Sequence, residues 1–193
     1  MLGRFHFMMH PVCDRALYEV RRVLPLTVDG DKAAHVRQQL AGQLARLWRY
    51  GVVLSGHRDV AEDLVQATCL RALERAEQFQ PGTRIDHWLL AILHSIWMNE
   101  VRARRIRQGH GFVDPETALT TDGVRTADAR VLANEIITRV QALPEAQRAT
   151  VFLAYVEEMT YRETADILGI PIGTVMSRLA SARATLAATG GKP

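Results

Sequence analysis

The residues nearest the N-terminus contain the first spacing that could do chemistry. His6, His10 and Cys13 form the pattern H-x3-H-x2-C, and imidazole and thiolate groups are donors that zinc prefers. A structural zinc site usually needs a fourth ligand, and none is apparent nearby in the sequence. An incomplete ligand set in a methionine-rich segment favours a chance pattern. We therefore expect no metal site and no other cofactor.

Cys69 is a second candidate, because a thiolate can act as a nucleophile. It stands beside Leu70 in a helical pattern, without a nearby base, so packing in a helical core is the favoured interpretation. An enzyme that uses Cys69 or a histidine remains an alternative, but we expect no enzymatic activity. Two cysteines, Cys13 and Cys69, are too few for a disulfide framework, which is typical of a cytoplasmic protein.

Arginines are the third group with chemical potential. Of the 24 basic residues 22 are Arg, and four of these lie within six positions: Arg102, Arg104, Arg105 and Arg107. The planar guanidinium fork suits phosphates and guanine edges. Codon bias would explain the overall Arg excess equally well, and cations near a helix C-terminus also complement its dipole. Four arginines exceed what a dipole needs, so the cluster favours contact with nucleic acid.

Composition divides the chain into two predicted domains. The segment 108–131 contains three glycines, one proline and an acidic excess, which is typical of a flexible linker. We expect an N-terminal extension over 1–35, helical domains over 36–107 and 132–188, and a tail over 189–193. No apolar run approaches the length of a membrane span and no secretory signal is apparent, so we expect no membrane insertion.

Helical periodicity runs through both domains, and no strand pattern of useful length occurs. The expected fold class is therefore all-α, with three helices in the first domain and four in the second. Asp59 and Glu62 have the spacing of a capping box, which predicts where the second helix begins. The positions expected to face inward in the first two helices are Val36, Leu40, Leu44, Leu47, Trp48, Leu64, Val65, Thr68, Ala72, Ala76 and Phe79.

The third predicted helix, from about 84 to 107, is apolar over a wide arc. Its two adjoining apolar faces hold Ile85, Trp88, Leu89, Ile92 and Ile96, and Leu90, Leu93 and Trp97. The remaining positions form one narrow polar strip, which we expect to be exposed: His87, His94, Met98, Arg102 and Arg105. Because this strip ends in arginines, it is the predicted nucleic-acid surface of the first domain.

The second domain has the pattern of a helix-turn-helix. Helices are predicted near 132–142, 145–157, 160–168 and 172–188, and Thr160 with Glu163 forms a capping box. Ala165 allows the helices to approach closely, Gly169 allows the tight turn, and Val175 buries the second helix against the first. Pro171 starts that second helix, where a missing N–H costs nothing. The pattern favours DNA binding.

Both halves resemble one family. AEDLVQATCLRAL and WMNEVRARR look like region 2 of an extracytoplasmic-function (ECF) sigma factor, and 140–187 looks like region 4. The resemblance covers roughly 36–107 and 140–187 in the expected order. It implies a cytoplasmic protein that binds core RNA polymerase and directs it to promoter DNA. Region 2 would recognise and help melt the minus-ten element, and region 4 would read the minus-thirty-five element. An anti-sigma partner is also implied.

Residue by residue, the resemblance assigns three roles. Asp63, Leu64 and Gln66 match the helix that docks on the polymerase clamp. Phe79 to Asp86 matches the loop that captures a flipped minus-ten base, so Phe79 and Arg84 become candidates. The strand-contacting face would comprise Ser95, Asn99, Arg102 and Arg105, and the family often has Asn in place of Ser95.

In region 4 the expected minus-thirty-five contacts come from one helix. Its outward and flanking positions are Gly173, Thr174, Met176, Ser177, Arg178, Ala180, Ser181, Arg183 and Ala184. The family usually has Lys or Arg at the position of Met176, and often larger or basic residues at Ala180 and Ser181. Few long side chains remain for base contacts, so upstream readout should rely on backbone contacts, the helix dipole and DNA shape.

Two other functions compete with this interpretation. A sigma-like mimic that binds an anti-sigma factor without supporting transcription would fit the small side chains of the recognition helix. The clamp motif and the arginine cluster argue against it. A stand-alone helix-turn-helix repressor would leave the first domain unexplained.

Overall fold

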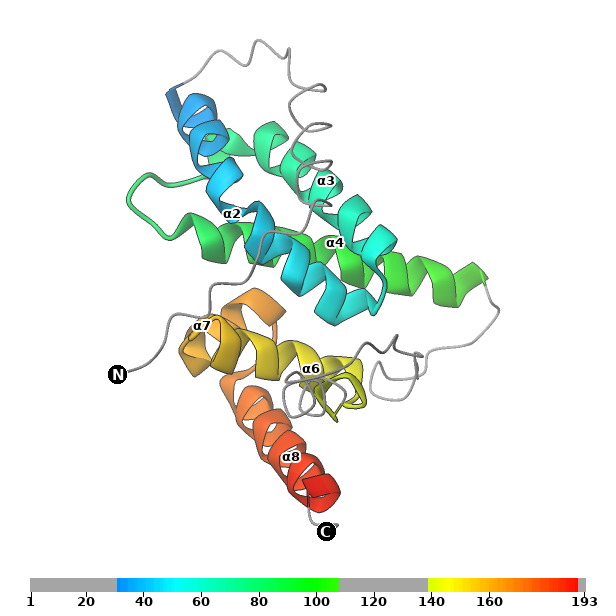
Figure 1. Ribbon diagram of the computed structural model, residues 1–193. Helices are drawn as coiled ribbons and strands as arrows, with labels where there is room; N and C mark the ends of the chain where they lie inside the picture. The colour runs from blue at the N-terminus through cyan, green and yellow to red at the C-terminus, as the bar shows by residue number, and fades with distance from the viewer. Residues whose placement is uncertain (1–30, 108–138, 191–193) are drawn as a thin grey trace, which may run out of the picture.

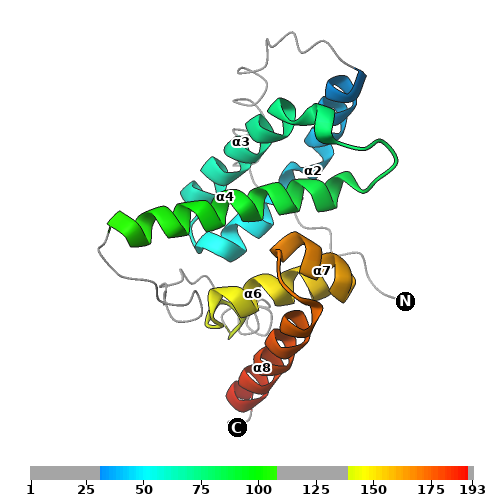
Figure 2. The same cartoon turned by 180° about the vertical axis from the view of Figure 1, so that it is seen from behind.

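The structure, a computed structural model, describes residues 31–107 and 139–190 and is all-α over those residues, which confirms the predicted fold class. The first domain contains α2 (Asp31–Ser55), α3 (Arg58–Glu74), the short turn η1 (Ala76–Gln78) and α4 (Ile85–Arg107). The helices α2 and α3 lie side by side and α4 crosses both of them, as both views show (Figures 1 and 2). None of the described helices is both long enough and apolar enough to cross a membrane.

The second domain contains α6 (Glu145–Val151), a wider π-helical turn η3 (Phe152–Val156), α7 (Tyr161–Leu168) and α8 (Ile172–Gly190). The predicted segment 145–157 is thus helical but changes its winding at Phe152. The helix predicted near 132–142 lies mostly outside the described residues. In Figure 1, α6 and α7 lie against the first domain while α8 projects away from it.

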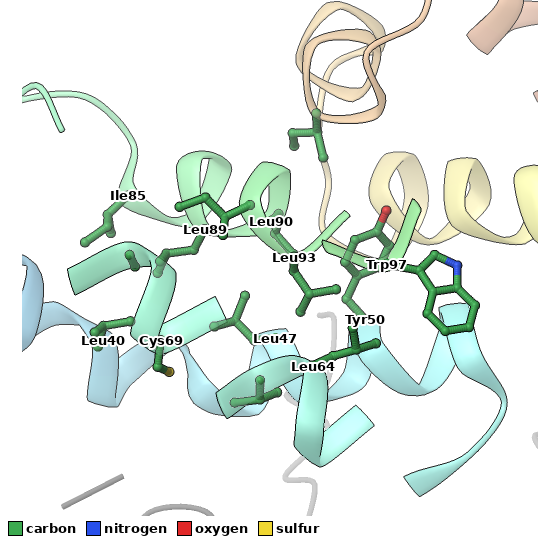
Figure 3. Packing of buried hydrophobic residues seen from close by; sticks show 14 of the residues in the cluster. Leu40, Leu47, Tyr50, Leu64, Cys69, Ile85, Leu89, Leu90, Leu93 and Trp97 are labelled. Atoms are coloured by element: carbon green, nitrogen blue, oxygen red, sulfur yellow. The ribbon is translucent and has the colours of Figure 1, made fainter. Parts of the chain in front are cut away.

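Helical periodicity correctly identified the core of the first domain. Of the inward positions predicted in α2, α3 and η1, all but the partly buried Trp48 are buried, and in α4 only Trp88 and Ile96 are partly buried. Figure 3 shows part of this core, with Leu47 of α2, Leu64 of α3 and Leu93 of α4 meeting between the three helices. Gly51 lets α2 and α3 approach closely, because a Cβ there would lie 3.1 Å from the Ala61 backbone.

The predicted capping box at Asp59 and Glu62 is wrong. The second helix begins at Arg58, its N-cap residue is His57, and no side chain caps it. Instead the Ser55 hydroxyl organises the turn between α2 and α3. Its oxygen accepts a hydrogen bond from the His57 N–H at 3.1 Å and lies 2.8 Å from the Gly51 carbonyl, to which it donates. A local turn contact therefore takes the place of the expected cap.

The two domains share one hydrophobic core. Phe152 stacks on Tyr50 of α2 with ring centroids 5.5 Å apart, and further side chains of the second domain join the same cluster: Ala149, Leu153, Met159, Ile167 and Leu168. A smaller cluster inside the second domain contains Leu143, Val151, Ala165, Val175, Leu179 and Ala182. We call this packed state of the two domains the closed arrangement.

Candidate nucleic-acid interface

One exposed strip of α4 carries three of the predicted strand-contacting residues. Ser95, Asn99 and Arg102 are all exposed and follow one another at helical spacing on one face. The Arg102 guanidinium donates to the Asn99 side-chain oxygen at 3.3 Å. This strip thus presents a hydroxyl, an amide and a guanidinium on one line, a set able to contact phosphates and base edges.

The arginine cluster does not form one surface. The guanidinium groups of Arg104 and Arg107 both pair with Glu100, at 3.0 and 3.3 Å, and that of Arg104 also lies over the Trp97 ring. Arg105 is partly buried and its charge acts on Glu145 of the second domain. Of the four arginines, Arg102 is the one aligned with Ser95 and Asn99. Arg105 therefore lies on a different side of α4 from Ser95 and Asn99, apart from the strand-contacting face to which it was assigned.

The polar strip predicted to be exposed on α4 is exposed at Arg102 but partly buried at its other positions, so the prediction is wrong for those. His87, His94 and Met98 are partly buried, and Met98 packs against the shared core. His94 Nδ1 lies 3.0 Å from the Tyr50 hydroxyl. Burial lowers the pKa of His94 to about 4, and the nearby charge of Arg178 lowers it further. Helical periodicity predicts which residues share this face of α4, but it does not predict what packs against them.

Phe79 is buried, with a fractional exposure of 2%. Its ring lies between the rings of His35 and Trp88, at centroid distances of 5.9 and 5.2 Å. In this structure Phe79 therefore cannot stack on a base. It packs in the core at the start of the loop. The exposed positions of the loop are 80–84, and the Thr83 hydroxyl donates to the Gln80 carbonyl at 2.7 Å.

Arg84, the predicted cation of this loop, is held in an ion-pair network. Its guanidinium donates to both Asp86 oxygens, at 2.7 and 3.2 Å, and Arg46 of α2 donates to Asp86 at 3.0 Å. Burial alone would raise the pKa of Asp86, but the hydrogen bonds and charge of Arg84 and the charge of Arg46 lower it overall. Arg84 also reaches Glu163 of α7 at 3.3 Å. Both domains thus hold this cation.

The predicted clamp-binding helix α3 presents two of its three candidates. Asp63 and Gln66 are exposed, whereas Leu64 is buried with a fractional exposure of 5%, so its side chain serves the core. Leu70 was missed, although it is 47% exposed. Asp63, Gln66 and Leu70 share one face at i, i+3 and i+7, a spacing that could have revealed this strip.

The helix-turn-helix has the predicted local geometry. The Thr160 hydroxyl accepts from the Glu163 N–H at 3.2 Å, and the Glu163 carboxylate accepts from the Thr160 N–H at 2.7 Å, which completes the capping box. Gly169 ends α7 with a φ of 65°, a left-handed conformation that favours glycine. Val175 is fully buried against α7. These three features aim α8 outward, and each of them was predicted.

The outward face of α8 is made of short side chains. Its exposed predicted positions are Gly173, Met176, Ser177, Ala180, Ser181, Arg183 and Ala184. Thr174 is partly buried, and the Ser177 hydroxyl donates to its carbonyl at 3.0 Å. Arg178 is also partly buried, because it lies towards His94 of α4. Arg183 is therefore the long cationic side chain exposed among these positions.

Neither zinc nor nucleophilic chemistry gains support within the described residues. His6, His10 and Cys13 lie outside them, and elsewhere no three His, Cys, Asp or Glu side chains are placed to hold a metal ion. Cys69 is buried, and burial raises the pKa of its thiol to about 12. A reactive cysteine needs a stabilised thiolate, so Cys69 is a packing residue.

Comparison with known proteins identifies both domains. The family description "Sigma-70 region 2" matches residues 38–106, and "Sigma-70, region 4" matches residues 133–186. The chain is 32% identical to the ECF RNA polymerase sigma factor EcfG of Rhodopseudomonas palustris over 153 residues, which are 79% of this chain and 83% of the relative. It is 33% identical to the ECF RNA polymerase sigma factor SigL of Mycobacterium tuberculosis over 77% of this chain and 84% of that one.

A solved structure also resembles this fold. The sigma factor RpoE of Bartonella quintana, crystallised in complex with the anti-sigma factor NepR, superposes with a TM-score of 0.60 at 28% identity. The likeness covers 78% of this chain and 92% of the other. It extends over both domains rather than over one alone.

Proposed function

Because the chain belongs to the family of ECF RNA polymerase sigma factors, we propose that it binds core RNA polymerase and directs it to promoter DNA. One observation carries this function. Domains that match region 2 and region 4 occur in order, and each exposes the surface that the function needs. In the first domain that surface is the strip of Ser95, Asn99 and Arg102, and in the second it is the outward face of α8.

The proposal divides the work between three surfaces. The exposed face of α3 around Asp63 and Gln66 docks on the polymerase clamp. The strip of α4 contacts the melted minus-ten strand, and α8 enters the major groove of the minus-thirty-five element. The polymerase supplies all bond-forming chemistry, so the sigma factor itself acts in the cytoplasm as a specificity subunit rather than as an enzyme. An anti-sigma factor is the expected regulatory partner, and the Bartonella relative was crystallised in complex with one.

Transcription over a randomised promoter library tests this function directly. Core polymerase with the purified chain should select a defined downstream element and tolerate most single changes upstream. A bidentate base contact discriminates by about 1–3 kcal/mol, or roughly 5- to 150-fold, and the short side chains of α8 offer few such contacts. Upstream changes that abolish transcription as strongly as downstream ones would refute this division. Absence of promoter-dependent transcripts would favour the alternative of an anti-sigma-binding mimic.

Substitution of Arg102 tests the assigned strand-contacting strip. Arg102→Ala should lower open-complex formation by about tenfold and reduce the salt dependence of promoter binding by about one phosphate contact. Arg105→Ala should have a smaller effect, because Arg105 faces Glu145 rather than the strip. Arg107→Ala is the matched control, since Arg107 pairs with Glu100 on another face of α4. Permanganate footprinting measures strand opening, and equal effects for all three variants would show that the strip is misassigned.

A further inference from the structure

A hydrogen bond within the exposed strip of α4 fixes the orientation of an amide. Arg102 Nη1 donates to Asn99 Oδ1 at 3.3 Å. A guanidinium carries N–H donors and no acceptor, so only the amide oxygen of Asn99 can face it. The Asn99 nitrogen, on the other side of the same planar amide, therefore points away from Arg102. Both side chains are exposed, so a partner can reach them.

The groups that this strip leaves available are mainly donors. The Asn99 nitrogen offers its N–H groups, and Arg102 keeps further N–H groups besides the one that binds Asn99. The second lone pair of the Asn99 oxygen lies close to the guanidinium charge, which disfavours the approach of another donor. One turn earlier Ser95 can either donate or accept, and one turn later Ile106 is 79% exposed and has no polar side-chain atom.

The carboxylate next to Asn99 in the sequence does not supply an acceptor to this strip. Glu100 accepts from Arg104 at 3.0 Å and from Arg107 at 3.3 Å. These three residues follow one another at i, i+4 and i+7, so they share another face of α4. Asn99 and Arg102 thus present adjacent donors without a carboxylate that competes for them.

Two adjacent donors distinguish the two purine bases. The O6 and N7 atoms of guanine are both acceptors, whereas adenine carries an amino donor, N6, in place of O6. An asparagine with a free amide suits adenine, because its oxygen accepts from N6 and its nitrogen donates to N7. In this chain Arg102 already occupies the oxygen of Asn99, so the pair is complementary to guanine instead.

We propose that Arg102 is a positioning residue for Asn99 and makes this pair select guanine over adenine at the promoter base that contacts the strip. The inference rests on the proposed function and adds the chemistry of the base to it. Arg102 thus has two effects. Its charge strengthens binding to any promoter, and its hydrogen bond determines which edge Asn99 can read. The second effect changes base preference, which a purely electrostatic or structural role would leave unchanged.

Transcription by core polymerase over a library randomised in the minus-ten region tests this base preference. The parent chain should use guanine about tenfold better than adenine at one position, and Asn99→Asp identifies that position because it removes the amide donor. Arg102→Ala should lower total transcription and also reduce the guanine preference by about tenfold, since it releases the Asn99 oxygen for adenine N6. Arg107→Ala is the matched control and should keep the preference, because Arg107 pairs with Glu100.

Two results of this selection would overturn the proposal. One is a loss of transcription in Arg102→Ala that is equal for promoters with guanine and with adenine. The other is an Asn99→Asp variant whose selected bases match those of the parent chain at every position. Hypoxanthine, which keeps O6 and N7 but lacks the guanine amino group, should replace guanine at the identified position without loss.

The orientation of the amide can be measured without polymerase. The chain contains two asparagines, Asn99 and Asn134, so isotope labelling of asparagine gives side-chain amide NMR signals from two residues, which Asn99→Asp assigns. Arg102→Ala should shift the Asn99 signals, because the amide oxygen loses its donor, and Arg107→Ala should leave them in place. Unshifted signals in Arg102→Ala would overturn the proposal. If no version supports promoter-dependent transcription, the proposed function fails, while these signals still decide whether Arg102 positions Asn99.

Discussion

Arg148→Met should lower the free energy of unfolding by about 3 kcal/mol, which is more than we expect from substituting an exposed arginine. Arg148 is 6% exposed, and its guanidinium donates to four backbone carbonyls. Those of Val53 and Leu54 belong to the end of α2, where helix carbonyls have no partner in their own helix. Those of Gln141 and Leu143 belong to its own domain. Methionine would fill the space but leave all four acceptors buried without a donor.

Urea denaturation of the full chain measures this effect. Arg162→Met is the matched control, because Arg162 is an exposed arginine of α7, and its stability should stay within about 0.5 kcal/mol of the parent chain. Arg148→Lys should fall between the two, since an ammonium keeps the charge but cannot reach all four carbonyls. If Arg148→Met were as stable as Arg162→Met, Arg148 would not stabilise the packing of the two domains.

The second large effect is a loss of stability between about pH 6.5 and pH 4. His94 has a pKa lowered to about 4 by burial and by Arg178, whereas an unfolded histidine titrates near 6.5. Below pH 6.5 the unfolded chain therefore binds a proton that the folded chain does not, and stability falls as the pH drops. The difference between these two pKa values corresponds to about 3 kcal/mol of stability lost by pH 4. Tyr50, the other group facing His94, stays neutral because burial raises its pKa.

Denaturation at several pH values tests this, with His94→Gln as the informative variant. Glutamine cannot titrate, so the variant should lose the parent chain's slope between pH 6.5 and 4 even if it is less stable at pH 7. His57→Gln removes an exposed histidine and should leave that slope intact. Asp86 and Glu163 have lowered pKa values, so the stability they contribute is lost only below about pH 4. An identical slope in the parent chain and His94→Gln would contradict the assignment.

Sequence reasoning predicted the features that depend on neighbours along the chain. The capping box of Thr160 and Glu163, the left-handed Gly169 and the buried Val175 each follow from a few adjacent residues, and all three are present. The inward faces of α2 to α4 were also predicted, because helical periodicity states which residues share a face. The wrong prediction at Asp59 also concerns neighbours along the chain, because the Ser55 hydroxyl binds the backbone of the turn where the cap was expected.

The family and its function were also readable from the sequence, because they rest on two motifs in a fixed order. Of the predicted site residues, some are exposed as a contact would require and others are buried. Ser95, Asn99 and Arg102 form one exposed strip, whereas Leu64 and Phe79 belong to the core. Helical spacing had placed both on the inward faces, so their burial was predicted, whereas their site roles came from the family resemblance alone.

Only the tertiary structure decided what lies opposite each helix face. His87 and His94 are polar enough for solvent, yet both are partly buried beside Glu163 and Arg178 of the second domain. Glu157 meets Arg49 across 108 residues, and Glu163 meets Arg84 across 79. Periodicity is a local property, while docking depends on two complete surfaces fitting together. The sequence by itself therefore determined the helices, the turn and the family, and the domain packing alone determined which predicted DNA contacts are engaged in the closed arrangement.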